Sequence, residues 1–446
     1  MYFKSFFNQQ LAQMSYLVGC QKTGEAIIID PLRDLKPYIE AAEQEGLTII
    51  KVTETHIHAD FASGLREANE TLNAKAFVSV LGGEDWTYKN INGEYELLKE
   101  DDIINVGNVK LKVIHTPGHT PESISFLLYD NASDVPMGLF TGDFIFVGDV
   151  GRPDLLEEAA GIKDTTEIGA KAMFNSLKKM DELPDYIQIW PGHGAGSACG
   201  KSLGAVPVTT LGYEREKSWA FQIKDEATFV KTLTSEQPEP PYYFKEMKHI
   251  NRDGVALIDN AIVPPLQNLY DGVKIIDLRA KEIFLDNLSD GINVPYNSKF
   301  LGFVGWYLDY EAPIQLIGSF EDVQNAANDL KLIGFDNVIG YVKNVTGGSM
   351  QQIEPQHFKS IDQTQINILD VRNNQEWQES HFDNAKHVHF GKLEKEEIPF
   401  KKDERIYVHC QSGVRSAIAV SVLHRLGYND IINIKGGYSA VKQYNR

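Results

Sequence analysis

The stretch that decides the fold is T-H-I-H-A-D-F, residues 55–61, which follows the apolar run of residues 49–52. Such a run is typical of a buried strand, so the motif begins where a strand ends. A chain leaving the strand here can point His56, His58 and Asp60 into one cleft. Imidazole and carboxylate are the ligands that borderline and hard divalent metals prefer. Phe61 cannot bind a metal, so the motif favours one ion with open coordination positions over a two-metal hydrolytic site.

Three further segments deliver a histidine or an aspartate after an apolar run or a Pro-Gly turn. They are H-T-P-G-H-T, T-G-D and W-P-G-H, which contain His119, Asp143 and His193. One such residue alone is usually a helix cap or a satisfied polar group. Four strand ends that each carry one indicate a metal centre. We expect His115, in the first of these segments, to be structural.

Composition limits the function classes. The chain has 446 residues, a formal net charge of −19, 42% hydrophobic residues and 24% charged residues. This length predicts roughly two to four domains of an ordinary globular protein. The acidic charge argues against a nucleic-acid partner, because phosphate contacts need clustered lysine and arginine. An anionic substrate needs only a local basic pocket.

Cysteine content and hydropathy indicate where the protein works. The three cysteines are Cys20, Cys199 and Cys410, too few for a disulfide framework, so a reducing compartment is expected. Residues 1–13 lack the continuous apolar core of a signal peptide. Apolar runs stay shorter than the roughly 18–20 residues of a membrane-spanning helix. We therefore expect a cytoplasmic protein without a membrane segment.

A proline-rich segment, S-E-Q-P-E-P-P at residues 235–241, predicts a semi-rigid linker. Before it, short strand-like runs alternate with helical stretches, which is an α/β pattern. The runs lie at residues 26–29, 49–52, 76–80, 111–114 and 124–128, and the helical stretches at 35–44 and 168–179. We predict an N-terminal domain at 1–235, a linker at 236–243, and further α/β domains at 244–350 and 351–446.

The part after the linker contains an internal repeat. I-I-D-L-R at 275–279 matches I-L-D-V-R at 368–372, and L-K-L-I-G-F at 330–335 matches L-H-R-L-G-Y at 423–428. Both pairs are 93 positions apart. Two copies of one α/β unit therefore follow the linker.

Cys410 ends a strand-like run and opens the loop Q-S-G-V-R, which leads into the helical stretch 416–426. Backbone N–H groups of such a loop, together with the helix N-terminus, favour the nucleophilic thiolate. Gly413 permits backbone angles that a larger residue resists. Arg415 can fix the loop or face a bound anion. The candidate loop residues are Gln411, Ser412, Gly413, Val414 and Arg415.

This strand, loop and helix resemble the rhodanese sulfurtransferases, whose loop cysteine becomes a persulfide at the position of Cys410. Asp370–Arg372 and Ser380–Ala385 resemble two further segments of that fold. Related phosphatases place five residues between cysteine and arginine, whereas four intervene here, so the loop suits sulfur better than phosphate. Gln411 stands where several thiosulfate-using relatives have a basic residue.

The first copy of the repeat lacks this chemistry. With the offset of 93, Cys410 corresponds to Ile317, Gly413 to Phe320 and Arg415 to Asp322. We interpret this copy as an inactive rhodanese-like domain that serves interaction or spacing.

The metal motifs resemble the metallo-β-lactamase fold, an αββα sandwich with its metal cleft at the loop edge. Among its branches, glyoxalase-II-type thioesterases use two metals, flavodiiron proteins use two irons, and persulfide dioxygenases bind one iron(II). The resemblance to the last implies the ligands His56, His119 and Asp143, a 2-His-1-carboxylate triad that leaves positions for substrate and O₂. His58, Asp60 and His193 then orient ligands or contact substrate.

Two more residues are candidates near this centre. Arg152, in G-D-V-G-R-P-D at 148–154, resembles the dioxygenase pattern and either holds an anionic substrate tail or supports the cleft. Cys199 lies six positions after His193 in a glycine-rich loop. It either accepts sulfur near the iron or only packs.

The whole chain resembles bacterial fusions of a persulfide dioxygenase with an inactive and an active rhodanese. The resemblance implies one Fe(II) per chain, and thiol persulfides, O₂, sulfite and thiosulfate as reaction partners. Persulfide is oxidised to sulfite, and Cys410 passes sulfane sulfur to sulfite to give thiosulfate. It also implies a homo-oligomer, a dimer or tetramer. The alternatives are a glyoxalase-II-like thioester hydrolase with an attached sulfurtransferase module, and a non-catalytic sulfur sensor.

Overall fold

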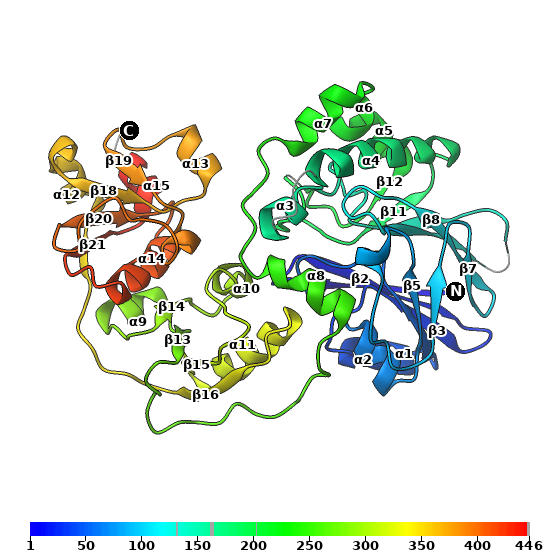
Figure 1. Cartoon of the computed structure of the whole chain (residues 1–446), viewed down its shortest axis with the longest axis horizontal. Coiled ribbons are helices and arrows are strands. Elements are labelled where there is room, and N and C mark those ends of the chain that lie inside the picture. The colour runs from blue at the N-terminus through cyan, green and yellow to red at the C-terminus, as the bar shows by residue number, and fades with distance from the viewer. Residues whose placement is uncertain (131–132, 161–164, 202, 444–446) are drawn as a thin grey trace. The chain divides into compact units, whose positions relative to one another are not determined.

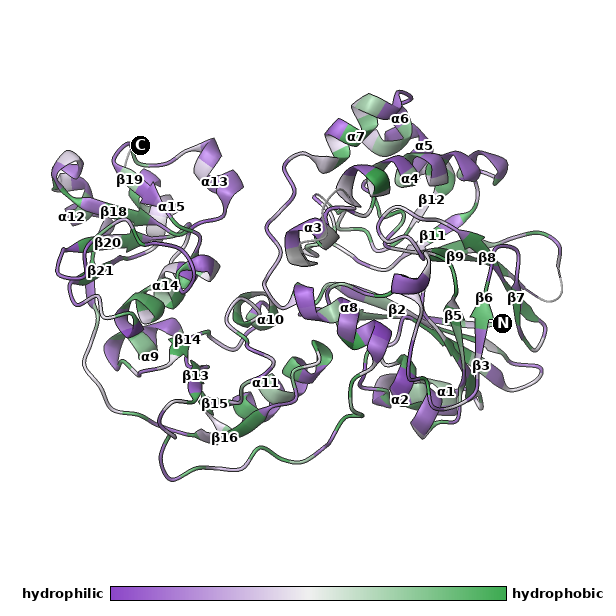
Figure 2. Cartoon of the chain, viewed as in Figure 1, coloured by the Kyte–Doolittle hydropathy of each residue, from purple (hydrophilic) through white to green (hydrophobic). Residues whose placement is uncertain are grey.

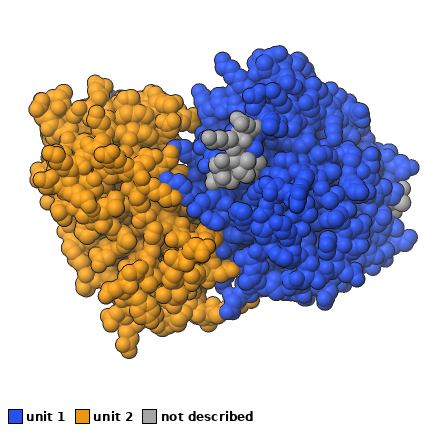
Figure 3. All heavy atoms as spheres, in the orientation of Figure 1, with its two compact units in different colours: residues 1–259, 331–334 blue, residues 260–330, 335–446 orange. Residues whose placement is uncertain are grey.

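The computed structural model describes residues 1–130, 133–160, 165–201 and 203–443. The chain divides into two units, which Figure 3 shows in blue and orange. The first unit comprises Met1–Asp259 and Lys331–Gly334, and the second comprises Asn260–Leu330 and Phe335–Arg446.

Two six-stranded sheets form the centre of the first unit. In spatial order, the first sheet contains β1 (Tyr2–Asn8), β2 (Gln13–Cys20), β3 (Glu25–Ile29), β4 (Thr48–Thr53), β5 (Lys75–Ser79) and β6 (Tyr95–Leu98). The second contains β12 (Thr209–Thr210), β11 (Gln188–Pro191), β10 (Gly138–Gly142), β9 (Ile124–Tyr129), β8 (Val109–His115) and β7 (Ile103–Val106).

The helices of this unit are α1 (Lys36–Gln44), α2 (Leu65–Thr71), α3 (Leu155–Ala160), α4 (Thr165–Lys179), α5 (Leu211–Lys217), α6 (Trp219–Gln222), α7 (Glu226–Thr234) and α8 (Phe244–Asp253). Helices α1 and α2 cover the outer face of the first sheet, α4 to α7 cover that of the second, and α3 and α8 lie beside the ends of the strands (Figure 1). One apolar core lies between the sheets, where residues such as Tyr16, Phe126 and Phe140 are buried. Two more cores lie between a sheet and its helices. This is the αββα sandwich predicted from the sequence.

Apolar periodicity explains the layers. Strand β8 alternates buried and half-buried residues, whereas every residue of β2 is buried. In Figure 2 the strands of the second sheet are largely green, whereas α4 is largely purple, because one side of this helix faces solvent.

The strand directions bring the predicted motifs to one edge. Strand β10 runs parallel to β11 and antiparallel to β9, and β9 runs antiparallel to β8. The ends of β8, β10 and β11 therefore lie at the same edge of the second sheet. The backbone N–H of Ile124, at the start of β9, donates to the Thr55 carbonyl (2.8 Å), which places the loop after β4 at this edge as well.

The proline-rich segment does not end the first unit. The unit continues through residues 236–243 and α8 to Asp259, beyond the boundary predicted at residue 235. The carbonyl of Pro238 accepts a hydrogen bond from the Arg152 guanidinium (2.5 Å). This stretch therefore packs as part of the metal domain.

The second unit holds two sheets with matching strand order. The first has β14 (Ile292–Asn293), β13 (Lys274–Asp277), β15 (Ile314–Ile317) and β16 (Val338–Val342). The second has β19 (Ala385–His387), β18 (Asn367–Asp370), β20 (Ile406–His409), β21 (Ile431–Ile434) and β17 (Gln351–Ile353). The helices are α9 (Lys281–Asp286), α10 (Phe300–Val304), α11 (Phe320–Leu332), α12 (Pro355–Ser360), α13 (Asn374–Glu379), α14 (Val414–Arg425) and α15 (Gly437–Gln443). The equivalent order agrees with the internal repeat.

The register of the two copies corrects one detail of the sequence comparison. Asp277 pairs with Ile317, and the equivalent Asp370 pairs with His409. Gly318, not Ile317, therefore takes the place of Cys410. Residues 318–319 connect strand to helix in the first copy, whereas 410–413 do so in the second. The first copy has a connection too short for the anion loop, and glycine replaces its nucleophile.

No helix in the described part of the chain combines the length and apolar character that crossing a membrane requires.

Candidate functional site

Three buried side chains converge at the edge of the second sheet, as the sequence predicts. Atoms of His56, His119 and Asp143 lie within 4.8 Å of one another. The Asp143 Oδ2 atom is 3.6 Å from His119 Nε2 and 3.9 Å from His56 Nε2. Among the described residues, none donates to or accepts from these three atoms. Three converging lone-pair atoms without a partner are costly in a protein interior and fit a divalent metal ion.

Neighbouring groups fix how the two imidazoles face the centre. The Nδ1–H of His119 donates to the Arg152 carbonyl (2.8 Å), which leaves Nε2 as the lone-pair atom. His56 Nδ1 lies 2.9 Å from Thr55 Oγ1. Burial lowers the pKa of His56 well below its ordinary value, and burial also lowers that of His119. Both rings are thus kept neutral, the form that ligates metals.

His193 lies beside the centre but its two ring nitrogens are occupied. Nδ1 is 2.7 Å from Asp143 Oδ1, and Nε2 is 2.8 Å from Asp60 Oδ2. Burial alone lowers the pKa of His193, but the two carboxylates together raise it well above its ordinary value. His193 is therefore a charged bridge that orients Asp143. This arrangement favours a three-ligand site.

The Nε2 atom of His58 is engaged outside the group of three ligand atoms. It lies 3.2 Å from Asp30 Oδ1, and the His58 ring packs on Phe61 at a centroid distance of 4.2 Å. Asp30 additionally accepts from the Thr55 backbone N–H (2.6 Å) and Thr55 Oγ1 (3.0 Å). The φ of Asp30 is +53°, a conformation that aspartate tolerates better than most residues. Sequence reasoning missed Asp30, whose only signal was its place directly after a strand.

Asn251 of α8 and Tyr243, directly before this helix, hold the loop after β4, and sequence reasoning missed both residues. The Asn251 amide donates to the carbonyls of His58 and Phe61 (both 2.8 Å) and accepts from the Ser63 N–H (2.8 Å). Tyr243 Oη donates to the Asp60 carbonyl (2.7 Å). These bonds join segments about 190 residues apart in sequence, beyond the reach of a local pattern.

The Arg152 guanidinium forms its ion pair and hydrogen bonds with other groups of the protein. It forms a two-point ion pair with Asp154 and donates to the carbonyls of Ala198 (3.2 Å) and Pro238. Its own carbonyl orients His119. Of the two roles predicted for Arg152, this geometry favours support of the cleft.

Cys199 lies in a second cluster with Asp60 and His193, whose atoms are within 4.8 Å of one another. The thiol is fully buried. Burial, followed by the charges of Asp60 and Asp143, raises the pKa of Cys199 well above its ordinary value. The sulfur is therefore a neutral thiol near neutral pH and a weak nucleophile.

A small cavity reaches the centre from outside. It has a volume of about 20 Å³ and is lined by His58, His119, the apolar residues Ile57, Trp86, Leu155 and Phe244, and the cations Lys245 and Lys248. The apolar walls suit sulfur and O₂, and the two lysines of α8 suit an anionic group at the mouth.

The persulfide loop predicted around Cys410 connects β20 to α14. The backbone N–H of Gly413 donates to Cys410 Sγ (3.1 Å), and the φ of Gly413 is +103°, which glycine alone adopts without strain. Cys410 is 1% exposed. Gly413 is buried, Gln411, Val414 and Arg415 are half-buried, and Ser412 is exposed.

The two arginines near Cys410 both have carboxylate partners. Arg372 is held by Asp370 (2.6 Å) and donates to Gln411 Oε1 (3.2 Å). Arg415 pairs with Glu376 through two contacts, one of them 2.8 Å. Arg415 thus fixes the loop to α13, which is one of the two roles predicted for it.

Comparison with known proteins agrees with the fold of both domains. The metallo-beta-lactamase superfamily model matches residues 9–193, and the rhodanese-like domain model matches residues 356–444. The solved structure of a metallo-beta-lactamase from Staphylococcus aureus is 52% identical, covers 77% of this chain and 98% of that chain, and has a TM-score of 0.72.

Curated relatives match the first unit. The human mitochondrial persulfide dioxygenase ETHE1 is 27% identical over 194 residues, which are 43% of this chain and 67% of that protein. A hydroxyacylglutathione hydrolase of Rhodospirillum rubrum is 32% identical over 178 residues, which are 40% of this chain and 60% of that protein. The chain spans about half to two thirds of the length of the curated relatives it matches. The chain belongs to the metallo-β-lactamase superfamily and carries a rhodanese-like domain, as its motifs predicted.

Proposed function

We propose that the chain is an iron(II) persulfide dioxygenase coupled to a sulfurtransferase. The observation that carries the proposal is the set of three unpartnered atoms on His56, His119 and Asp143, beside a His193 whose nitrogens are both taken. Three ligands on one side match the 2-His-1-carboxylate pattern of non-haem iron oxygenases. Iron(II), when bound there, supplies the positions at which sulfur and O₂ meet. The likeness to a persulfide dioxygenase supports the same assignment.

The overall reaction balances without another oxidant. A thiol persulfide, O₂ and water give the thiol and sulfurous acid, which is sulfite after loss of its protons. The terminal sulfur loses four electrons and O₂ gains them. Within the first unit, Lys245 and Lys248 line the cavity beside the centre and would attract a carrier thiol that bears negative charge, and the apolar wall limits the access of water. His193 holds Asp143 in its ligating orientation.

The second site handles the sulfur that has not been oxidised. The Cys410 thiolate attacks the terminal sulfur of another persulfide, whose S–S bond breaks to release the carrier thiol. The resulting Cys410 persulfide is attacked at its outer sulfur by sulfite. Thiosulfate leaves and the thiolate is restored, while the Gly413 N–H stabilises the sulfur anion in both steps. The products are sulfite and thiosulfate.

The metal assignment can be tested with the His56→Ala variant, which removes one of the three ligands. We expect bound iron and O₂ uptake to fall together by more than tenfold, because the facial set is incomplete. His115→Ala is the matched control, since His115 lies in the same motif as His119 but its Nε2 bonds the Pro121 carbonyl (2.9 Å). Retention of iron and O₂ uptake by His56→Ala contradicts the site.

The division of labour can be tested with Cys410→Ser. Oxygen uptake should persist while the product shifts from thiosulfate to sulfite, because the covalent carrier is lost. Cys20→Ser is the control, since Cys20 lies at the end of β2. Unchanged thiosulfate output by Cys410→Ser contradicts the assigned carrier.

A thioester hydrolase is the second candidate, because a hydroxyacylglutathione hydrolase is also a relative. It predicts two zinc ions per chain and thioester cleavage under argon. Metal analysis of the purified protein and an oxygen electrode with added persulfide separate the two functions. About one iron per chain with O₂-dependent turnover supports the dioxygenase.

A further inference from the structure

The two rhodanese-like copies share a built interface within the second unit. Tyr307 Oη donates to the Phe390 carbonyl (2.6 Å), and the Asn293 N–H donates to Ser421 Oγ (2.9 Å), both in buried surroundings. The Trp306 ring packs on the His389 ring, with 4.6 Å between the ring centroids. Helix α9 of the inactive copy also contacts α14 of the active copy. The inactive copy therefore has a defined position beside the persulfide loop.

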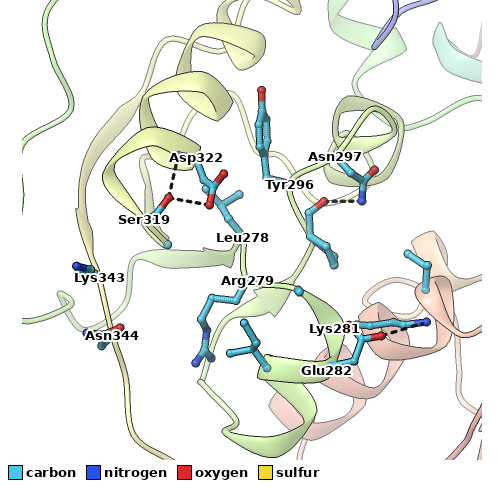
Figure 4. Close-up of a pocket in the computed structure, with 15 residues that line it drawn as sticks. Leu278, Arg279, Lys281, Glu282, Tyr296, Asn297, Ser319, Asp322, Lys343 and Asn344 are labelled. Carbon is cyan, nitrogen blue, oxygen red and sulfur yellow. Dashed lines mark hydrogen bonds and ion pairs between the residues drawn. The ribbon is translucent and has the colours of Figure 1, made fainter.

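Lys281, the first residue of α9, reaches that loop. A methyl group placed on Gly413 lies 3.2 Å from Lys281 Nζ. Gly413 is the residue whose N–H donates to Cys410 Sγ. In Figure 4 the Lys281 side chain extends from the inactive copy toward the ribbon of the active copy. A cation from one copy thus stands beside the sulfur-binding loop of the other.

The active copy itself offers no comparable cation among its described residues at the loop. Three cations touch the loop or line its cavity, and each has a carboxylate partner; the pairs are Arg372–Asp370, Arg415–Glu376 and Lys435–Glu354. Gln411, next to the nucleophile, is neutral. Lys281 has only a longer contact, 3.7 Å to Glu282, whose side chain is 71% exposed. Its charge is therefore the least neutralised of these four.

Lys281 also stands where small molecules can approach. Two cavities of about 640 and 410 Å³ share Lys281 and Glu282 in their walls. The larger reaches the loop at Val414 and the smaller at Gly413. Both cavities therefore have the Lys281 side chain and a residue at the end of the persulfide loop in their walls.

We infer that Lys281 of the inactive copy is the cation that draws a small sulfur oxyanion to the persulfide of Cys410 and sets the acceptor specificity. The inference rests on the proposed sulfurtransferase function of Cys410. In the step concerned, the lone pair of the oxyanion sulfur attacks the outer persulfide sulfur. The Cys410 S–S bond breaks, its electrons return to the thiolate, and thiosulfate leaves. Lys281 is a binding residue for the anion and exchanges no proton.

The test uses the full-length protein under argon, so that O₂ chemistry is absent. Cys410 is loaded with sulfur from a small thiol persulfide, excess donor is removed, and loading is checked by intact-mass measurement. The loaded protein is mixed with sulfite, or with dithiothreitol as an acceptor that bears no oxyanion, and the rate of sulfur loss is followed. The variants are Lys281→Ala, Lys281→Arg and Lys343→Ala. Lys343 is the matched control, because it lines the larger cavity on the side opposite Lys281 (Figure 4).

We expect Lys281→Ala to slow transfer to sulfite by about tenfold at low sulfite, the loss of one charged contact. Saturating sulfite should restore most of the rate, and transfer to dithiothreitol should stay unchanged. Lys281→Arg should recover most of the sulfite rate. Added salt should slow the wild-type reaction with sulfite more than that of Lys281→Ala. Lys343→Ala should match the wild type.

Two results overturn the inference while leaving the proposed function intact. One is a Lys281→Ala protein that reacts with sulfite as fast as Lys343→Ala. The other is an equal loss toward sulfite and dithiothreitol, which indicates a structural role for Lys281. A wild-type protein that accepts no sulfur on Cys410, or does not pass it to sulfite, instead contradicts the proposed function.

Discussion

At the residue scale, the candidate metal centre depends on which nitrogen or oxygen atom of each side chain has no hydrogen-bond partner in the protein. One polar atom is hydrogen-bonded to a protein group, and the other faces the centre, in each of His56, His119 and Asp143. In His193 both ring nitrogens are hydrogen-bonded to carboxylates, so neither is available to a metal ion. Residue type alone makes all four candidates. Their hydrogen-bond partners are the reason that we propose only His56, His119 and Asp143 as ligands.

Glu122 is a buried acid whose titration should be visible in stability. Its Oε1 accepts from the Ile57 N–H (2.7 Å), and burial raises its pKa from 4.5 to about 7. Between these two pH values the folded state holds a proton that the unfolded state has lost. Stability of the first unit therefore falls as pH rises through this window and levels off above it.

The Glu122→Gln variant keeps an acceptor for Ile57 and removes the titration. Its thermal midpoint relative to the wild type should rise between about pH 5 and pH 8, by the equivalent of roughly 3 kcal/mol. Calorimetry at several pH values measures this difference. Glu84→Gln, at an exposed site, is the control. A midpoint difference that is constant with pH contradicts the assignment.

At the element scale, α8 holds the loop after β4 in place through hydrogen bonds to its backbone. Asn251 alone makes three buried hydrogen bonds to residues 58–63. The helix follows three prolines that read as a spacer, yet it belongs to the first unit. The proline-rich composition before α8 therefore predicts neither the domain boundary nor the role of this helix.

Asn251→Ala should loosen that loop. Three backbone groups lose their partner, so we expect the free energy of unfolding of the first unit to fall by about 2–4 kcal/mol. Iron affinity should fall as well, because His58 and Phe61 flank the ligand loop. Chemical denaturation and an iron-binding titration give the two readouts. Asn175→Ala, on the exposed face of α4, should change neither.

At the scale of the whole molecule, the metal centre lies in one unit and the persulfide loop in the other. Each unit has its own buried core. We therefore expect two thermal transitions, of which only one responds to metal. Chelation should lower the midpoint of the first unit, since a ligand at 100 times its dissociation constant stabilises the folded state by about 2.7 kcal/mol.

The transition of the second unit should not move on chelation, and Cys410 should still accept sulfur from a persulfide under argon. Calorimetry with and without chelator, followed by intact-mass measurement of the sulfur load, checks both points. Loss of both transitions together would show that the units depend on each other.

Local sequence patterns predicted the sandwich and the internal repeat, and they singled out Cys410 as the candidate nucleophile and His56, His119 and Asp143 as the candidate ligands. They could do so because strand ends carry such patterns, and neighbouring strand ends meet at one sheet edge. The folded structure was needed to show that Asp30 and Asn251 hold the loop after β4, that Gly318 corresponds to Cys410, and that Lys281 lies beside Gly413. These features depend on strand register and on contacts between segments far apart in the chain. The periodicity of side chains along the sequence predicts neither of them.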